Sequence, residues 1–132
     1  YYLRPATAPR FFPDTYREAI DRLLALDPFP TRLLFAHHGE NTGDCRKLLM
    51  DARAQVDTWI ATVRDTMATV QSLNFADQPE DENALLTMLR HELTKADPIY
   101  ARGADLPDDI RQRERDFTNQ TLRGILGHLK GR

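Results

Sequence analysis

The sequence predicts a mainly helical chain that carries one short α/β unit near its N-terminal end. Three observations lead to this fold class. Apolar residues recur at helical spacing over most of residues 44–130. A short apolar run at residues 31–36 lies between a proline turn and a polar, glycine-containing stretch, which favours a buried strand. The length of 132 residues, with 41% hydrophobic and 29% charged residues, is enough for one ordinary core.

The first 43 residues supply the α/β unit. Residues 1–13 hold three prolines and four aromatic residues, so we expect an extended segment, because proline fixes φ and removes an amide donor. A helix is predicted to begin at Pro13, where proline and then an acidic residue form a start signal, and to stop at the proline-rich turn 27–30. The strand at residues 31–36 follows, and then a glycine-containing loop.

Residues 44–132 are predicted to form three helices. The first follows Gly43, ends before residues 74–78, and is about 45 Å long at about 1.5 Å per residue. Its apolar stripe includes Cys45 and Trp59, which we interpret as a core residue and a packing anchor. The second helix starts at residues 79–82, and the third starts at residues 106–109. We therefore divide the chain into residues 1–43 and a helical extension, residues 44–132.

Charge and composition exclude several classes of partner. Lysine plus arginine total 18 against 20 acidic residues, a net charge of -2, whereas nucleic-acid binding needs a surplus of positive charge on one face. The arginines of residues 111–115 are neutralised locally by carboxylates within residues 108–116. No apolar run approaches the roughly 20 residues that span a bilayer, so we expect no membrane partner. One cysteine fits a reducing compartment, and we expect a cytoplasmic protein.

The histidines are the candidates for chemistry. His37 and His38 follow the predicted strand, a common position for functional residues in α/β folds, and imidazole is a frequent metal ligand. Successive strand residues face opposite ways, so only one of the pair can easily face a given site. The alternative is an ordinary polar pair in a loop. His91 lacks the second histidine of a zinc-protease helix because Lys95 stands there, and His128 fits a helix end.

Three segments of residues 4–39 share a pattern with one protein family. They are Arg4-Pro5-Ala6-Thr7-Ala8-Pro9, Leu23-Leu24-Ala25-Leu26 and Leu33-Leu34-Phe35-Ala36-His37-His38-Gly39. Together they resemble the later part of metallo-β-lactamase-fold hydrolases, where an R-P-A-T-P-P segment precedes a helix and a strand ends in T-H-F-G or a close variant. The tail, with Asn119, Leu122, Gly124, Leu126 and Leu129, looks like the C-terminal extension of one branch of that family.

The resemblance implies a fold, an activity and a metal. Residues 1–43 would be the C-terminal part of an αββα metallo-β-lactamase fold, and residues 44–132 a three-helix extension. In the full-length parent, a metal-bound hydroxide would attack an ester, thioester, amide or phosphoester. His37 matches the last ligand of the family's dinuclear centre, whose divalent metal we expect to be zinc, and His38 takes an aromatic position. The family's H-x-H-x-D-H run and bridging aspartate do not occur in this sequence.

Two hypotheses from different classes follow. In the first, the chain is a C-terminal fragment of such a hydrolase, inactive and without a stably bound metal, and its partner is the upstream part of its own polypeptide. The start at Tyr1 rather than at a methionine fits this expectation. In the second, the helical part is an interaction or dimerisation module, because its long apolar stripe is hard for one small domain to cover. A homodimer could use that surface or the exposed edge of the strand.

Overall fold

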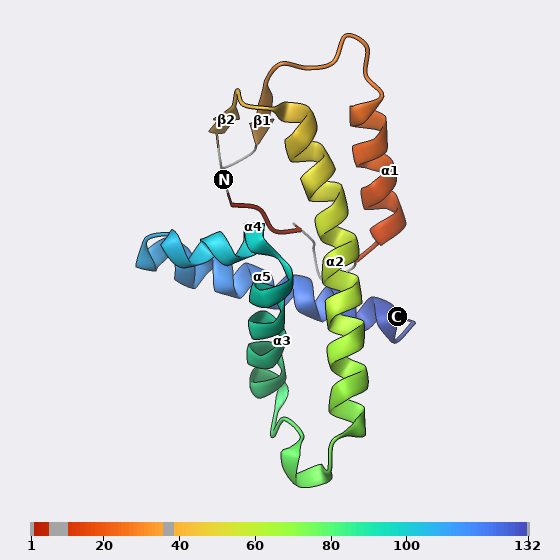
Figure 1. The fold of residues 1–132 in the computed structure, drawn as a ribbon, viewed down its shortest axis with the longest axis vertical. Helices are drawn as coiled ribbons and strands as arrows, with labels where there is room; N and C mark the ends of the chain where they lie inside the picture. The colour runs from red at the N-terminus through yellow and green to blue at the C-terminus, as the bar shows by residue number, and fades with distance from the viewer. Residues whose placement is uncertain (1, 6–10, 36–38, 132) are drawn as a thin grey trace. The chain divides into compact units, whose positions relative to one another are not determined.

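A computed structural model shows a mainly helical chain with a small two-stranded sheet (Figure 1). The structure describes residues 2–5, 11–35 and 39–131. The helices are α1 (Pro13–Leu24), α2 (Cys45–Ser72), α3 (Glu82–Ala96), α4 (Pro98–Ala101) and α5 (Asp108–Leu129). Single 3₁₀ turns span Phe75–Asp77 (η1) and Arg102–Asp105 (η2). Strands β1 (Leu33–Phe35) and β2 (Gly39–Asn41) are antiparallel, with Leu34 opposite Glu40.

The chain divides into two compact units. The helical unit comprises residues 1–11 and 55–132, and the α/β unit comprises residues 12–54, so the division falls inside α2. The domain boundary that we expected between residues 43 and 44 stays a prediction. The described part of the chain contains no helix that is long and apolar enough to cross a membrane.

The helical unit has a completely buried core. Its apolar side chains with 0% exposure come from α2, α3 and α5 and are Val56, Trp59, Val63, Leu86, Leu89, Leu93, Leu122 and Ile125. Helices α3 and α5 pack against each other, and Figure 1 shows α5 running across the direction of α3. These residues confirm the helical stripes expected from the sequence. Phe117 and Leu129 also lie on the apolar stripe of the last predicted helix, and there the expectation of burial is wrong in part, because they are 39% and 38% exposed.

Polar contacts join α1 to the first turns of α2 in the α/β unit. Asp21 accepts two hydrogen bonds from the Arg53 guanidinium, at 2.6 Å and 3.1 Å. Arg46 lies over the ring of Phe29, 4.1 Å from its centroid, and donates to the carbonyl oxygen of Leu24 at 3.3 Å. The arginine hydrogen bond lowers the pKa of the Asp21 carboxyl. Exposed charge pairs of this kind orient the two helices but add little stability.

The strand differs most from its prediction. We expected a buried strand at residues 31–36, but the Leu34 side chain of β1 is 81% exposed. The only described strand that pairs with β1 is β2, and the described residues leave the Leu34 side chain of this two-stranded sheet largely uncovered. Strand β2 was itself missed, because its polar residues lie in a stretch that we expected to be a loop. An ion pair of 3.2 Å between Arg32 and Glu40 links the two strands.

Candidate functional site

His37 lies outside the described residues, as does His38; in sequence they fall between Phe35 and Gly39, which pair across the hairpin. The other two histidines are described. His91 lies on an exposed face of α3, and the ring of His128 meets Phe11 edge to face at 5.8 Å. The exposed position of His91 fits an ordinary helix surface, and His128 lies in the last turn of α5, which agrees with the helix end expected for it.

The described residues do not fit a metal centre by themselves. Among residues 2–5, 11–35 and 39–131, no three histidine, cysteine, aspartate or glutamate side chains gather where they could hold a metal ion. A hydrolytic metal site needs at least about three protein ligands. Cys45 is buried, and its Sγ lies 3.7 Å from the carbonyl oxygen of Asn41, which agrees with the expected core role.

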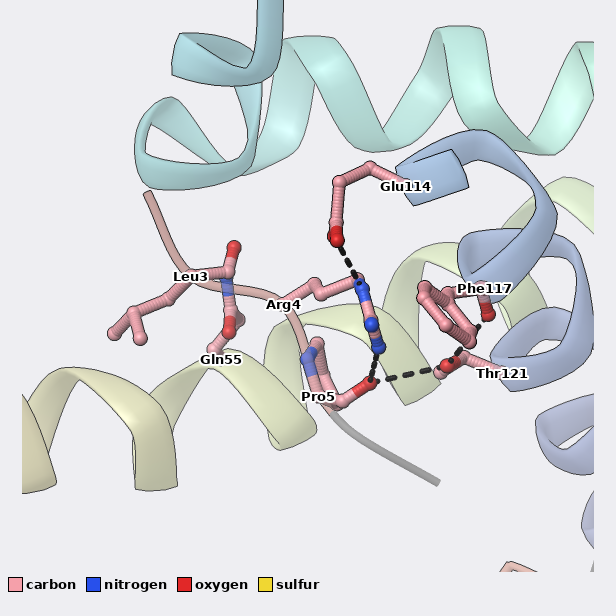
Figure 2. Close-up of polar contacts among 7 residues, drawn as sticks. All are labelled: Leu3, Arg4, Pro5, Gln55, Glu114, Phe117 and Thr121. Atoms are coloured by element: carbon pink, nitrogen blue, oxygen red, sulfur yellow. Dashed lines mark hydrogen bonds and ion pairs between the residues drawn. The ribbon is translucent and has the colours of Figure 1, made fainter. Parts of the chain in front are cut away.

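Residues 3–5 are bound by side chains of α2 and α5 in the helical unit (Figure 2). Arg4 donates from Nε to Oε2 of Glu114 at 2.6 Å, and the two side chains are only 13% and 9% exposed. The Arg4 guanidinium also lies over the ring of Phe117, 4.7 Å from its centroid. Because a buried charge is tolerated only when it is paired, Glu114 fixes the position of Arg4.

The backbone of the same segment is bound as well. The hydroxyl of Thr121 donates to the carbonyl oxygen of Pro5 at 3.0 Å, and Nε2 of Gln55 donates to the carbonyl oxygen of Leu3 at 2.8 Å. An extended segment has no helix partners for its carbonyl groups, so side chains must take that role when the segment is covered. Residues 3–5 are therefore attached to α2 and α5 at successive positions.

Asp97 connects α2 to the junction of α3 and α4. Its Oδ2 accepts hydrogen bonds from Nε2 of Gln55 at 2.7 Å and from Nε1 of Trp59 at 2.8 Å. Its Oδ1 accepts from the backbone amides of Ile99 and Tyr100, both at 3.0 Å, and so caps α4. The residue is only 5% exposed. Four donors thus replace water around one carboxylate, and we assign Asp97 a structural role.

A cavity of about 260 Å³ opens beside the bound segment. Its lining includes Tyr2, Arg90 of α3, Tyr100 of α4 and Arg115 of α5. Burial raises the pKa of the Tyr2 hydroxyl, and the charge of Glu114 raises it further. Burial also raises the pKa of Tyr100. Sequence reasoning missed this cavity, because its walls come from positions that are up to about a hundred residues apart.

Comparison of the chain with protein-family models, with curated proteins and with solved structures found no match.

Proposed function

We propose that this chain is the C-terminal part of a metal-dependent hydrolase with the metallo-β-lactamase fold. Residues 1–43 belong to its catalytic domain, and residues 44–132 form its helical extension. The substrate class is an ester, thioester, amide or phosphoester, and His37 is one ligand of a divalent metal, with zinc the expected ion. The chain alone is inactive, because the remaining ligands come from the upstream part of the polypeptide. The order of α1, β1 and then a long helical tail supports this reading.

The binding of residues 3–5 by the helices is the observation that carries the proposal. Arg4 and Pro5 open the R-P-A-T segment on which the resemblance rests, so in the proposed parent they belong to the catalytic domain. Their partners, Glu114 and Thr121, belong to the helical extension. A separable interaction module would have no need of this segment. An extension that is folded onto its own catalytic domain would bind it in this way.

The exposed apolar side chains of the α/β unit also support the proposal. Leu34, Phe12 and Met50 are 81%, 64% and 56% exposed, and all three lie in residues 12–54. A partner that covered these side chains would remove their apolar surface from water. We assign that role to the upstream part of the same polypeptide, which would supply the missing strands and layer of the catalytic domain.

The proposal is tested in the protein encoded by the complete reading frame. We expect about two bound metal ions and ester hydrolysis that a chelator abolishes. His37→Ala should lower bound metal and should reduce the rate by about tenfold or more, since even residues behind a metal ligand have effects of that size. His38→Ala is the matched control: it removes the same side chain one position away and should leave metal content and rate nearly unchanged.

Two outcomes would refute the hydrolase proposal. One is a reading frame that encodes no histidine-rich run upstream of residue 1 and a product that neither binds metal nor hydrolyses esters. The other is equal behaviour of the two histidine variants. Circular dichroism of both variants separates loss of a ligand from loss of the fold.

Self-association is the second candidate function, and one observation favours a particular form of it. The helical stripe that suggested a dimer is covered within the chain, since Val56, Trp59 and Val63 are completely buried. The hairpin instead exposes Leu34 and has strand edges with which no other described strand pairs. If the hairpin mediates association, sedimentation should show a mass that rises with protein concentration. Leu34→Ser should lower that mass, and the control Leu129→Ser should not. A monomer at all concentrations would exclude this candidate.

A further inference from the structure

We propose that the cavity between Tyr2, α3, α4 and α5 binds a small organic anion, whose carboxylate or phosphate group lies between Arg90 and Arg115. This inference concerns the helical unit alone and does not depend on the hydrolase proposal. The cavity measures about 260 Å³, slightly below the range of about 300 to 1,000 Å³ that is typical of ligand pockets, so it suits only a small ligand.

The charges of the lining favour an anion. Three arginines and one carboxylate line the cavity, and two of these groups already have partners: Glu114 pairs with Arg4, and Arg111 pairs with Asp108. Arg90 and Arg115 form no ion pair with a carboxylate in the part of the chain that the structure describes. The cavity therefore keeps two positive charges that no described protein carboxylate neutralises.

The guanidiniums of Arg90 and Arg115 line the same cavity. Burial lowers the pKa of Arg90, and the like charge of Arg115 lowers it further. Arg90 is held in place by neutral acceptors, Oδ1 of Asn119 and the hydroxyl of Thr87. Arginine keeps its charge in proteins, so two neighbouring guanidiniums repel each other unless an anion lies between them. Planar forks of N–H donors match the oxygens of carboxylate and phosphate groups.

Thr118 is an independent sign of a ligand. It lines the cavity from α5, its side chain is 0% exposed, and its Oγ1 has no hydrogen-bond partner. Hydrogen bonding to Thr118 lowers the pKa of the Tyr2 and Tyr100 hydroxyls, against the larger effect of burial, so both hydroxyls lie beside Oγ1, although neither contact has the geometry of an ordinary hydrogen bond. A buried hydroxyl without a partner is costly. A ligand oxygen that accepts from Thr118 would remove that cost.

Two tyrosine rings supply an apolar wall. The rings of Tyr2 and Tyr100 lie 6.2 Å apart and are inclined at 38°. Gly103 permits this arrangement, since a Cβ at that position would lie 2.9 Å from the Tyr2 ring. The ring of Tyr100 is held from another side by Trp59, at 5.0 Å and edge to face. An aromatic or aliphatic body on the anion would contact these rings, so the proposed class is an organic anion rather than a bare ion.

The test titrates the whole chain with benzoate and with phenyl phosphate by calorimetry at constant ionic strength. At least one probe should bind to a single site with a dissociation constant of about 1 mM or tighter. Benzylamine, a cation of similar size, should not bind. Preference for one anion identifies the head group as carboxylate or as phosphate, and either preference supports the proposal.

Variants locate the site. Arg115→Ala should weaken binding about tenfold, and Thr118→Val, which keeps the shape but removes the hydroxyl, should weaken it about threefold. Arg113→Ala is the matched control: it removes the same charge from the same helix at a residue that does not line the cavity, and it should change affinity less than twofold.

The proposal is overturned if neither anion binds up to about 10 mM or if benzylamine binds as well as the anions. Equal weakening by Arg113→Ala and Arg115→Ala would also overturn it, because it would indicate a diffuse attraction to positive charge. Thermal melts of the variants confirm that each is folded, and Arg115→Lys, which keeps the charge without the planar fork, should recover only part of the affinity.

Discussion

The buried side chain of Asp97 holds three helices together through its hydrogen bonds, because it ends α3, caps α4 and accepts from α2. The sequence marks it as a helix stop before Pro98, and it does end α3. Nothing in that local pattern reveals that the same carboxylate accepts hydrogen bonds from Gln55 and Trp59, 42 and 38 residues away. Its position between α2 and α4 depends on tertiary packing. Periodicity therefore predicted Trp59 as a core residue, but not the partner of its indole nitrogen.

Replacement of Asp97 should be among the most destabilising single changes in the helical unit. Asp97→Ala removes the acceptor of two buried side-chain donors and the cap of α4, and we expect a loss of about 3 kcal/mol or more in the free energy of unfolding. Asp97→Asn, which keeps one acceptor oxygen, should lose less. Urea denaturation followed by circular dichroism measures both values.

The control for this series is Asp105→Ala, which removes an exposed carboxylate from the 3₁₀ turn η2. Its unfolding free energy should change by less than about 0.5 kcal/mol. Similar losses for the two aspartates would contradict the role assigned to Asp97.

Tyr2 predicts a specific response to alkaline pH. Burial raises its pKa, so the folded chain keeps a proton that the unfolded chain releases above about pH 10. The unfolded state then binds fewer protons than the folded state, and the free energy of unfolding falls as the pH rises through that range. Tyr2→Phe should make this fall in the free energy of unfolding less steep. Part of the fall should remain, because the pKa of Tyr100 is also raised by burial. Denaturation series at pH 8 and above measure how steeply the free energy of unfolding falls with pH. Equal slopes for the original chain and for Tyr2→Phe would exclude a contribution from Tyr2.

At the scale of elements, the long helices were predictable and the short elements were not. Helix α3 begins where the acidic start signal placed it, because Asp81 caps it by accepting from the amide of Ala84 at 2.8 Å. Helix α4 has a single turn and β2 has three residues. Both elements are too short to show a repeating pattern of apolar residues in the sequence. Both exist because of contacts with neighbouring segments.

The attachment of residues 3–5 to α2 and α5 could not be predicted from the sequence either. The residues of the Arg4–Glu114 pair are 110 positions apart, and the notion that Glu114 neutralises the nearby arginines concealed its actual partner. The same misreading hid Arg115 as a cavity residue. Charges counted along a helix suggest that neighbours in sequence form ion pairs. In the folded chain, the ion-pair partner of a side chain depends on the face of the helix on which it lies and on what packs against that face.

A double-mutant cycle measures the strength of this attachment. Arg4→Ala and Glu114→Ala should each destabilise the chain by about 3 kcal/mol, because each leaves a buried charge without its partner. Their coupling energy should be about 2 kcal/mol. The control cycle uses the exposed pair Lys95–Glu92, with N···O at 2.8 Å, whose coupling should be below about 0.5 kcal/mol. Equal coupling energies for the two pairs would show that burial does not strengthen the interaction between Arg4 and Glu114.

At the scale of the whole molecule, the two units differ in how completely they bury their own apolar surface. Every apolar side chain with 0% exposure belongs to the helical unit, among the residues that the structure describes. The most buried apolar residues of the α/β unit, Cys45 and Leu48, are each 4% exposed, while Leu34 and Phe12 lie largely open. The sequence predicted one core for the chain, because total composition cannot say how apolar residues are shared between units.

Hydrogen exchange should reveal this difference within the intact chain. Opening free energy follows local burial, so amides of α1 should exchange at least about tenfold faster than amides in the centres of α3 and α5. Helix α1 is a suitable reporter, because Ile20 and Pro13 are its only buried residues and it has no side-chain cap. Mass spectrometry of peptic fragments resolves the three helices. Equal protection of all three would contradict the view that residues 12–54 are incomplete alone. In the proposed complete hydrolase, the upstream part would cover Leu34 and Phe12, and protection of α1 should rise toward that of α5 while α3 and α5 stay unchanged.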